Sequence, residues 1–421
     1  MTAPATPVTV LIVGAGDRGT VYARCAAALP HRARIVAVAE PRAFQRKAMA
    51  RAHGIAPDRV FRCWSEAASH PRLADAVVIA TPDALHEAPA VAFARRGYSI
   101  LLEKPMAPTA PACRRIRDAV VRGGNVFAVG HVLRYTDYTR AVKEIVASGA
   151  LGDLVSVQHL EPVGYWHQAH SFVRGNWRNE AESTFMLMSK SCHDLDWIRH
   201  IVGRPCRRVS SFGSLLHFRR ENRPARAADR CLDCPVARAC PHDAARLYRG
   251  LLRRGVRGWP VNVMAPEATP AAVRRALREG PYGRCVYDCD NDVVDHQVVA
   301  MEFEGGPTAT FTMTAFTSMT YGRTTRVFGT RGELLGDSRT IRWTDFRTGR
   351  ERVVDPSRRA GRRAGTGHGG GDGGLFDAFI HAVATGDRSS ILSGPDETLE
   401  THRIVFAAER ARRTGRVARV G

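Results

Sequence analysis

The most constraining feature of the chain is an apolar run that leads directly into a glycine-rich turn near its start. Residues 8–13 read Val-Thr-Val-Leu-Ile-Val, and Gly14, Gly16 and Gly19 follow, before a helical pattern that continues to Leu29. A strand, a glycine turn and a helix in this order allow backbone amides to approach a pyrophosphate at the helix N-terminus. The segment therefore predicts a dinucleotide-binding unit.

The next predicted strand supplies an acidic residue at the place where such units bind ribose. Residues 34–39 form this strand, and Glu40 follows it, about twenty residues past the glycines. A carboxylate there can hold both hydroxyls of an adenosine ribose, which favours NAD, whereas the nearby Arg42 suits a 2′-phosphate and keeps NADP open. Strand and helix patterns alternate as far as residue 130, and this alternation predicts a parallel sheet with helices on both faces.

A third feature is the segment 98–105, an apolar run that ends in Glu103, Lys104 and Pro105. Such a run fits a buried parallel strand whose carboxyl end points charged residues into the ligand-binding crevice. The chain has 62 Lys and Arg residues, but only positions 47, 104, 143 and 190 are lysines. An ammonium can lend a proton and a guanidinium stays protonated, so we select Lys104 and Lys190 as candidate functional residues.

Length and composition limit the class of protein. With 421 residues and 44% hydrophobic content, the chain can bury a large core, and its length favours two domains. No apolar run approaches the ~18 residues needed to cross a bilayer, and no signal-peptide pattern is present, so we expect a soluble, cytoplasmic protein without a membrane partner. The net charge of +21 is spread along the chain, which argues against nucleic acid as a partner.

Several motifs, in their order along the chain, resemble the glucose-fructose oxidoreductase, inositol dehydrogenase and rhizopine-catabolism family, usually written Gfo/Idh/MocA. The matching segments are Gly14 to Gly19, Thr81-Pro82-Asp83 with His86, Glu103-Lys104-Pro105, Gly130-His131 with Arg134-Tyr135, Gly152, His193-Asp194-Leu195-Asp196, and the helix 397–413. The resemblance implies a Rossmann domain followed by an α/β domain with a mainly antiparallel sheet, whose open face often forms the contact of a homo-oligomer. It also implies hydride exchange between a nicotinamide and a hydroxyl-bearing carbon of a sugar or cyclitol.

The resemblance also implies roles for individual residues. Lys104 and His193 match residues that serve substrate binding and proton transfer. Family members typically place an aspartate four residues before this histidine, but this chain has Ser189 there, followed by Lys190. A serine cannot stabilise an imidazolium as a carboxylate does. Lys190, one of the few lysines, is close enough along a helix to reach the same cleft as His193, and we include it among the candidate catalytic residues. The expected cofactor contacts are Gly14, Gly16, Asp17, Arg18, Gly19, Glu40, Thr81, Pro82, His86, Glu103 and Lys104.

Further candidates for substrate contact come from segments with little periodicity. Residues 164–180 read as a loop with Glu161 just before it, and Trp beside Arg suits stacking on a sugar ring. Each loop residue, taken singly, fits an ordinary surface position equally well. Some sugar-active members of the family have a His-Gly-Gly segment like that at residues 368–370. We expect contacts with the substrate from His167, His170, Arg174, Trp177, Ser189 and His368.

An insertion at about residues 204–282 differs in composition and is rich in arginine, proline and cysteine. Ten cysteines in a chain expected to be cytosolic argue for metal ligands or free thiols over disulfides. Four sulfurs would suit a structural zinc ion, and buried free cysteines are the equally weighted alternative. The candidate ligands are Cys231, Cys234, Cys240, Cys285 and Cys289.

The sequence thus predicts a Rossmann domain at 1–130, a substrate-binding domain at 131–371 and C-terminal helices at 372–421. The predicted activity is NAD(P)-dependent oxidation or reduction of a sugar, cyclitol or related polyol, in which Lys104 binds the reacting hydroxyl and His193 takes its proton. One alternative uses bound NAD transiently for the net hydrolysis of a glycoside. A non-enzymatic alternative makes the insertion a polyanion-binding module on a vestigial dehydrogenase.

Overall fold

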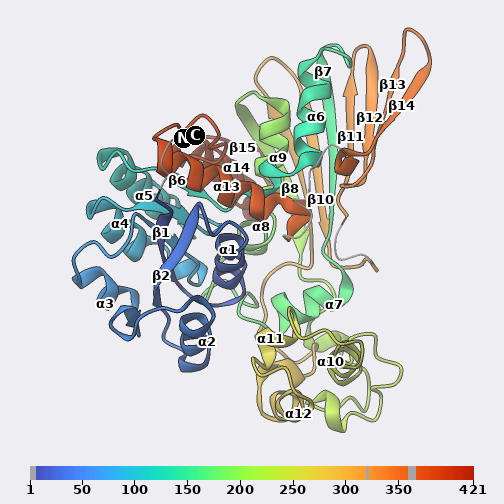
Figure 1. The fold of residues 1–421 in the computed structure, drawn as a ribbon. Coiled ribbons are helices and arrows are strands. Elements are labelled where there is room, and N and C mark those ends of the chain that lie inside the picture. Colours follow the sequence, from blue (N-terminus) through green and yellow to red (C-terminus); the bar gives the residue numbers. More distant parts are fainter. Residues whose placement is uncertain (1–5, 319–321, 359–366) are drawn as a thin grey trace.

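Two β-sheets organise the residues that this computed structural model describes, which are 6–318, 322–358 and 367–421 (Figure 1). Every strand pair in the N-terminal sheet is parallel. The second sheet is mixed and mostly antiparallel. The arrangement confirms the predicted fold class, a Rossmann domain followed by an α/β domain.

The parallel sheet has the strand order β3-β2-β1-β4-β5-β6. Its strands are β1 (Val8–Val13), β2 (Ala33–Ala39), β3 (Val60–Phe61), β4 (Ala76–Ile79), β5 (Ser99–Leu102) and β6 (Phe127–Val129). The intervening helices are α1 (Asp17–Ala27), α2 (Ala43–His53), α3 (Trp64–Ser69), α4 (Glu87–Arg95) and α5 (Ala110–Arg122). The central strands are continuously apolar because helices cover both faces of the sheet. The order reverses between β1 and β4, where open sheets bind ligands at the strand ends.

The second sheet has the order β14-β13-β12-β11-β7-β10-β9-β8-β15. Its strands are β7 (Leu154–Pro162), β8 (Cys206–Ser214), β9 (His296–Phe303), β10 (Thr308–Thr314), β11 (Thr324–Gly329), β12 (Gly332–Gly336), β13 (Ile341–Asp345), β14 (Arg350–Val354) and β15 (Ala418–Arg419). Burial alternates along β9 and β10 because one face packs on helices and the other is open. The packed face contacts α6 (Asp137–Ala147), α9 (Cys192–Val202) and α14 (Pro395–Thr414).

The open face of the second sheet exposes large apolar side chains. They come from five strands that are far apart in sequence. These residues are Val155, Phe212, Val298, Leu335 and Val353. Apolar groups gathered on one sheet face favour contact with another protein surface.

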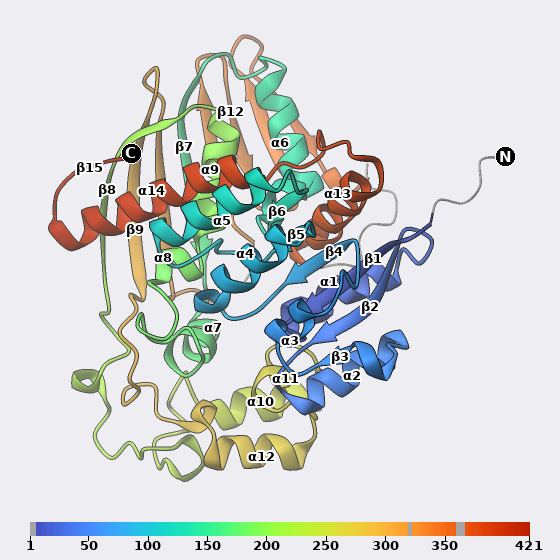
Figure 2. The ribbon, with the colours of Figure 1, turned by 90° about the vertical axis from the view of Figure 1, so that its left-hand side faces the viewer.

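The C-terminal helices bridge both domains. Helix α13 (Gly371–Thr385) packs Leu375, Phe376 and Phe379 into the core of the Rossmann domain. Helix α14 contacts α5, α9 and β8, and Figure 2 shows it lying across this junction. Like the other helices in the described part of the chain, α14 is not long and apolar enough to cross a membrane.

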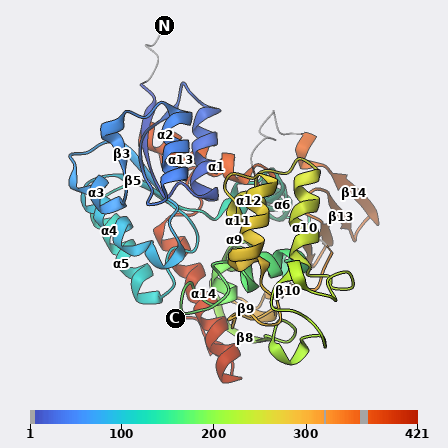
Figure 3. The ribbon, with the colours of Figure 1, turned by 90° about the horizontal axis from the view of Figure 1, so that it is seen from below.

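The insertion lies between β8 and β9 and forms a lobe with its own small core. Its helices are α10 (Ala244–Arg253), α11 (Val261–Met264) and α12 (Pro270–Glu279), and Tyr248, Val261 and Leu277 are buried among them. The view from below shows α11 close to α1 (Figure 3). Asn262 Nδ2 donates to Asp17 Oδ1 over 3.4 Å, so the lobe reaches the glycine turn.

Candidate active site

The glycine turn leaves the N-terminus of α1 open to a phosphate group. Gly14 has φ +91°, and a Cβ there would lie 2.5 Å from Ala80 O, just past β4. A Cβ on Gly19 would collide with Gly14 O. Gly16 precedes α1 and has no side chain to cap it, so the backbone N–H groups of the first turn face outward. These features fit the pyrophosphate of a dinucleotide.

Glu40 follows β2 at the expected ribose position. Its Oε2 accepts a hydrogen bond from Ala15 N at 2.8 Å, and Oε1 accepts from Arg42 N at 2.9 Å and Arg42 Nε at 2.7 Å. Burial opposes ionisation of the carboxyl, but the hydrogen bonds from Arg42 hold the pKa of Glu40 below its usual value. An ionised carboxylate at this position can accept hydrogen bonds from ribose hydroxyls.

Arg18 and Glu103, both expected to contact the cofactor, belong to an ion-pair network. Arg18 Nε lies 2.7 Å from Glu103 Oε1, and Arg18 Nη2 lies 2.6 Å from Asp372 Oδ1. Tyr22 OH donates to the same Glu103 oxygen at 2.8 Å. Burial opposes ionisation of Glu103, but Arg18 lowers its pKa. The network joins α1, β5 and α13, so it fixes the strand end that carries Lys104.

His86 joins two loops of the Rossmann domain. Its Nδ1 lies 2.8 Å from Pro105 O, and its Nε2 lies 2.9 Å from Thr81 O. Both ring nitrogens therefore face backbone carbonyls, and His86 holds these two loops together. Thr81 and Pro82 lie just past the carboxyl end of β4, beside the predicted cofactor crevice.

Lys104 extends from the Rossmann domain to the second domain. Its Nζ donates to Ser189 O at 2.5 Å. Ser189 ends α8 (Met186–Ser189), directly before the helix that carries His193. The Ser189 hydroxyl is turned toward Met186 O at 3.4 Å. At Ser189, where the resemblance led us to expect an aspartate, this chain therefore offers Lys104 a backbone carbonyl.

His193 faces a guanidinium from a distant part of the chain. Its Nε2 lies 2.9 Å from Nη2 of Arg323, the residue before β11. A guanidinium only donates, so Nε2 carries the lone pair and the neutral ring has its proton on Nδ1. Burial lowers the pKa of His193 well below its ordinary value; Asp194 opposes this shift and Arg323 adds to it. The ring is therefore neutral at neutral pH.

Two carboxylates surround His193 and Arg323. Glu161, near the end of β7, binds Lys190 Nζ through Oε1 at 2.8 Å and Arg323 Nη2 through Oε2 at 2.9 Å. Asp194 binds Arg323 Nε, and its Oδ2 lies 3.6 Å from His193 Nε2. Glu161 and Asp194 therefore place negative charge beside His193 and Arg323. Sequence reasoning missed Arg323, because no motif marks it.

His368 reaches this group from the glycine-rich segment before α13. Its ring centroid lies 6.4 Å from that of His193, and its Nδ1 lies 3.1 Å from Asp372 Oδ2. The fold therefore gathers five of the predicted site residues at one seam between the domains. They are Lys104, Ser189, Lys190, His193 and His368.

His167 and Trp177 border this group. Burial lowers the pKa of His167 well below its ordinary value, and the nearby ammonium groups of Lys190 and Lys104 add to the shift. Trp177 Nε1 donates to Asp83 Oδ2 at 3.1 Å. Asp83 was not selected from the sequence, although it belongs to the Thr-Pro-Asp motif. Burial raises the pKa of Asp83, against the charges of His86 and Lys104.

The stretch expected to be a loop, residues 164–180, begins with regular structure. It contains α7 (Tyr165–His167) and a π-helical turn over Gln168–Val173, and every residue of that turn is buried. A π-helical turn does not follow the 3.6-residue period of an α-helix, and the sequence pattern therefore resembled a loop.

His170 and Arg174 point into the insertion instead of the seam. His170 Nδ1 lies 2.6 Å from Tyr248 OH on α10, and Arg174 Nε donates to Arg284 O at 2.7 Å. Their placement corrects the expectation of substrate contact, because both side chains are buried against the lobe and support it.

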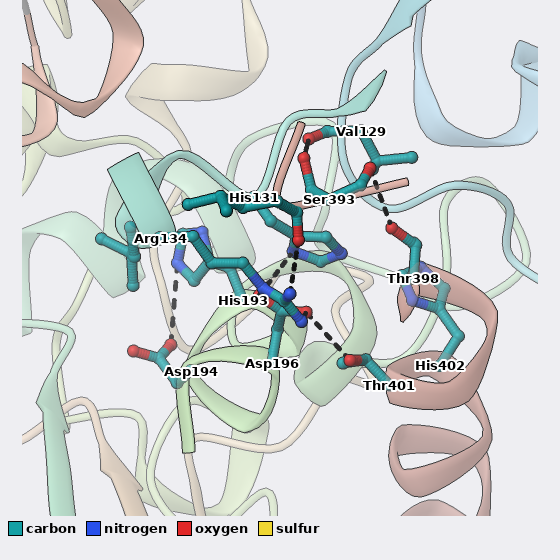
Figure 4. Close-up of polar contacts among 12 residues, drawn as sticks. Val129, His131, Arg134, His193, Asp194, Asp196, Ser393, Thr398, Thr401 and His402 are labelled. Atoms are coloured by element: carbon teal, nitrogen blue, oxygen red, sulfur yellow. Dashed lines mark hydrogen bonds and ion pairs between the residues drawn. The ribbon is translucent and has the colours of Figure 1, made fainter. Parts of the chain in front are cut away.

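A buried network holds α9 against α14 and against the segment that follows β6 (Figure 4). Asp196 on α9 accepts two hydrogen bonds of 2.7 Å from Arg134 and one of 2.9 Å from Thr401 Oγ1. Burial opposes ionisation of the carboxyl, but the charge of Arg134 helps to lower the pKa of Asp196 to about 2. Because α9 also carries His193, this network positions the imidazole at the seam.

The cysteines do not form the predicted zinc site. Within residues 6–318, 322–358 and 367–421, no group of three or more His, Cys, Asp or Glu side chains is placed to hold a metal ion. Cys289 is turned aside and donates to Cys285 O at 3.1 Å. The predicted ligands are all free thiols: Cys231, Cys234, Cys240, Cys285 and Cys289. The expectation of zinc is therefore not supported.

Two family models match the two parts of the chain. Residues 8–131 match the model of an oxidoreductase family with an NAD-binding Rossmann fold. Residues 143–420 match the model of the C-terminal alpha/beta domain of the same family, Gfo/Idh/MocA.

Individual relatives match over shorter stretches. The inositol 2-dehydrogenase of Rubrobacter xylanophilus is 30% identical over 196 residues, which are 46% of this chain and 52% of that protein. The 2,7-anhydro-N-acetylneuraminate hydratase of Escherichia coli is 25% identical over 145 residues, or 34% of this chain and 38% of that protein. The chain thus spans 38% to 52% of the length of these two relatives.

Solved structures share the whole architecture. An oxidoreductase from Agrobacterium radiobacter, in complex with NAD+, L-tartaric acid and magnesium, has a TM-score of 0.71 and covers 99% of both chains. Its sequence is 15% identical, so this likeness shows the fold alone.

Proposed function

Because the chain belongs to the Gfo/Idh/MocA family of oxidoreductases, we propose that it transfers a hydride between a nicotinamide and a hydroxyl-bearing carbon of a sugar, cyclitol or related polyol. One observation carries the proposal: Lys104 from the parallel sheet reaches α8, directly beside the helix of His193. An ammonium and a neutral imidazole are the groups needed to bind a hydroxyl and remove its proton.

The glycine turn and Glu40 support NAD as the cofactor. The N-terminus of α1 at Gly16 would hold the pyrophosphate, and Glu40 would hold the ribose hydroxyls. When bound, the nicotinamide supplies the site that accepts or donates the hydride. A 2′-phosphate would meet the buried negative charge of Glu40, and Arg42 is already paired with that carboxylate. This arrangement favours NAD over NADP.

Lys104 would bind the oxygen of the reacting hydroxyl. Its ammonium has three N–H groups, and one of them is bound to Ser189 O. Another can donate to a substrate oxygen, which stabilises the developing alkoxide and lowers the pKa of the hydroxyl. A guanidinium has the same charge but neither the compact shape nor the same ability to give up a proton.

His193 would take the proton at Nε2. Arg323 donates to that nitrogen, but Glu161 and Asp194 also bind the guanidinium and can retain it when the substrate hydroxyl approaches His193. Asp194 then lies close enough to stabilise the imidazolium. In the direction of reduction, the same nitrogen returns the proton.

The remaining seam residues would orient the polyol. His167, Trp177 and His368 border the Lys104 and His193 pair, and Ser189 offers its carbonyl. Aromatic and imidazole rings suit the faces and hydroxyls of a sugar or cyclitol. Family membership also favours an enzyme over the alternative of a polyanion-binding module.

A panel of polyols and glycosides tests the reaction class. NADH absorbance and product analysis should be followed together in each reaction. We expect NADH to accumulate in proportion to the oxidised polyol. Hydrolysis of a glycoside without net NADH would instead support the redox glycosidase alternative.

We also propose that the chain self-associates through the open face of the second sheet. The apolar residues there are the observation that supports it, and Phe212 and Val298 lie directly opposite each other on paired strands. Light scattering of the wild-type protein and of Phe212→Glu should show an oligomer that the substitution dissociates. A monomeric wild-type protein would contradict the proposal.

A further inference from the structure

Two tryptophans from distant parts of the chain lie side by side where the insertion lobe meets the second domain. Trp166 is part of α7, and Trp259 lies two residues before α11 in the lobe. Their ring centroids are 5.3 Å apart, and the ring planes are inclined by 44°. Trp259 also meets the ring of His167 edge-on, at a centroid distance of 4.9 Å. The insertion therefore adds an aromatic ring to the border of the candidate active site.

Neither tryptophan packs as an ordinary core residue. Trp166 and Trp259 are both only half-buried. Neither belongs to the apolar clusters that the described residues form in the cores of the lobe and of the second domain. Single apolar side chains on a surface need no explanation, but adjacent ones form a patch of the kind that marks a binding site. The pair is therefore a candidate for contact with a ligand.

The segment that carries Trp259 runs between the two ends of the crevice. Three residues further on, Asn262 Nδ2 donates to Asp17 Oδ1 over 3.4 Å, beside the glycine turn that would hold the pyrophosphate. At the other end, Trp259 contacts His167, which borders the proposed catalytic pair. Residues 259 and 262 are at most about 11 Å apart. Cofactor and substrate must meet between these two ends, so the segment lies along the space where the substrate binds.

The chemistry of this aromatic group suits a sugar ring. The C–H groups on the faces of a sugar ring are apolar, and an aromatic ring buries them without competing for the hydroxyls. The ring of His167 lies 6.0 Å from that of Trp166 and 4.9 Å from that of Trp259, and an imidazole can form a hydrogen bond with a hydroxyl. The three side chains together combine flat apolar surface with a polar edge.

We propose that the two tryptophans and His167 form a subsite for a second sugar ring. This ring is joined to the polyol ring that reacts at Lys104 and His193. The inference rests on the proposed function and specifies the substrate class, a glycoside or disaccharide in place of a free polyol. The tryptophans contact His167 on the side of the insertion, so a ring stacked on them extends beyond the ring that reacts. No bond of the second ring forms or breaks, and its role is to increase affinity.

Calorimetry on the NAD-saturated protein tests the subsite without relying on turnover. Maltose, cellobiose and galactinol are the two-ring ligands, and glucose and myo-inositol are the single-ring ligands. We expect at least one two-ring ligand to bind about tenfold or more tightly than its single-ring counterpart, because the stacked ring buries additional apolar surface. Two-ring ligands that bind no more tightly than the single rings would overturn the proposal.

Substitution of the tryptophans locates the effect. Trp259→Leu keeps an apolar side chain but removes the aromatic ring, and it should weaken binding of the two-ring ligand about tenfold, whereas Trp259→Phe should retain most of the affinity. Trp343→Leu, on β13 and also half-buried, is the matched control and should keep the wild-type preference. Trp166→Leu makes the same test from α7 if Trp259→Leu does not fold. Wild-type affinity for the two-ring ligand in either leucine variant of the pair would overturn the subsite.

An assay of NADH formation with the same ligands separates this inference from the proposed function. Binding of a two-ring ligand that depends on Trp259 but yields no NADH would contradict the proposed function and support the subsite. NADH formation from single-ring polyols, without tighter binding of any two-ring ligand, would overturn the subsite alone.

Discussion

The two sides of the candidate site are built by contacts of very different range along the chain. On the Rossmann side, Gly14, Gly16 and Glu40 lie within 27 residues of one another and follow consecutive strands. On the other side, Arg323 meets Glu161 and His193 only because β11 pairs with β7. The Rossmann side can therefore be recognised from a local sequence motif, whereas the other side depends on the packing of the whole second domain.

The largest loss of turnover should come from replacing His193, the proposed proton acceptor on the second-domain side of the site. His193→Asn keeps a polar side chain but removes the imidazole, and turnover should fall by about 10³-fold because proton transfer loses its acceptor. Steady-state kinetics with NAD and a reactive polyol measure it. His200→Asn, on the same helix and only half-buried, is the control. Equal losses in both variants would mean that α9 had been disturbed instead.

A substitution on the local side should affect cofactor binding more than chemistry. Gly14→Ala places a Cβ against Ala80 O in a backbone conformation that disfavours it, at about 1–3 kcal/mol. NAD affinity should fall roughly tenfold or more. Gly54→Ala is a matched control, because Gly54 also has positive φ but has no atom within 4 Å of the added Cβ. Similar NAD affinities for the two variants would argue against a close approach at Gly14.

Removal of one carboxylate tests the replacement for the missing aspartate. Glu161→Gln keeps the shape but removes the negative charge that pairs with both Lys190 and Arg323. We expect turnover to fall about tenfold, which is about 1.4 kcal/mol in the barrier, because Glu161 does not itself transfer the proton. The acid limb of the rate profile should also move to lower pH, because an imidazolium at His193 loses a nearby negative charge. Glu333→Gln, at a half-buried position of β12 away from the site, should change neither quantity. A normal rate in Glu161→Gln would leave Asp194 as the functional carboxylate.

The pH profile of the wild-type protein should show the smallest effect, a displaced acid limb. His193 has a lowered pKa, and only its neutral form accepts a proton, so the oxidation rate should stay constant as pH falls past the ordinary histidine value of about 6.5. The decline should begin well below that value. A limb centred at or above pH 6.5 would contradict the environment described for His193.

Local patterns were sufficient for the parts of the molecule that rest on local contacts. The glycine turn, Glu40 and the charged end of β5 follow directly from strand, turn and helix signals. The sequence could not place Arg323, which reaches His193 through sheet pairing and has no motif. His170 was misassigned because a π-helical turn has no ordinary period and the lobe covers it.

The missing aspartate shows the same limit. The sequence has Ser189 where the resemblance implied an aspartate, but it did not show that Glu161 and Asp194 would bring negative charge close to His193. Glu161 and Asp194 come together only in the folded protein. Because they are far apart in the sequence, their shared position could not be predicted from it. The cysteines of the lobe are similar, since their spacing was compatible with zinc but their placement around a cavity is not.

The central claim is that Lys104 acts in the chemistry at the seam and is more than a positive charge. The most direct test compares turnover and NAD affinity for wild-type protein, Lys104→Arg, and the surface control Lys47→Arg. The account predicts that Lys104→Arg loses turnover by about 10²-fold while NAD affinity changes little, because a guanidinium keeps the charge but does not replace a compact proton-lending donor. Turnover of Lys104→Arg at the wild-type rate would contradict that claim.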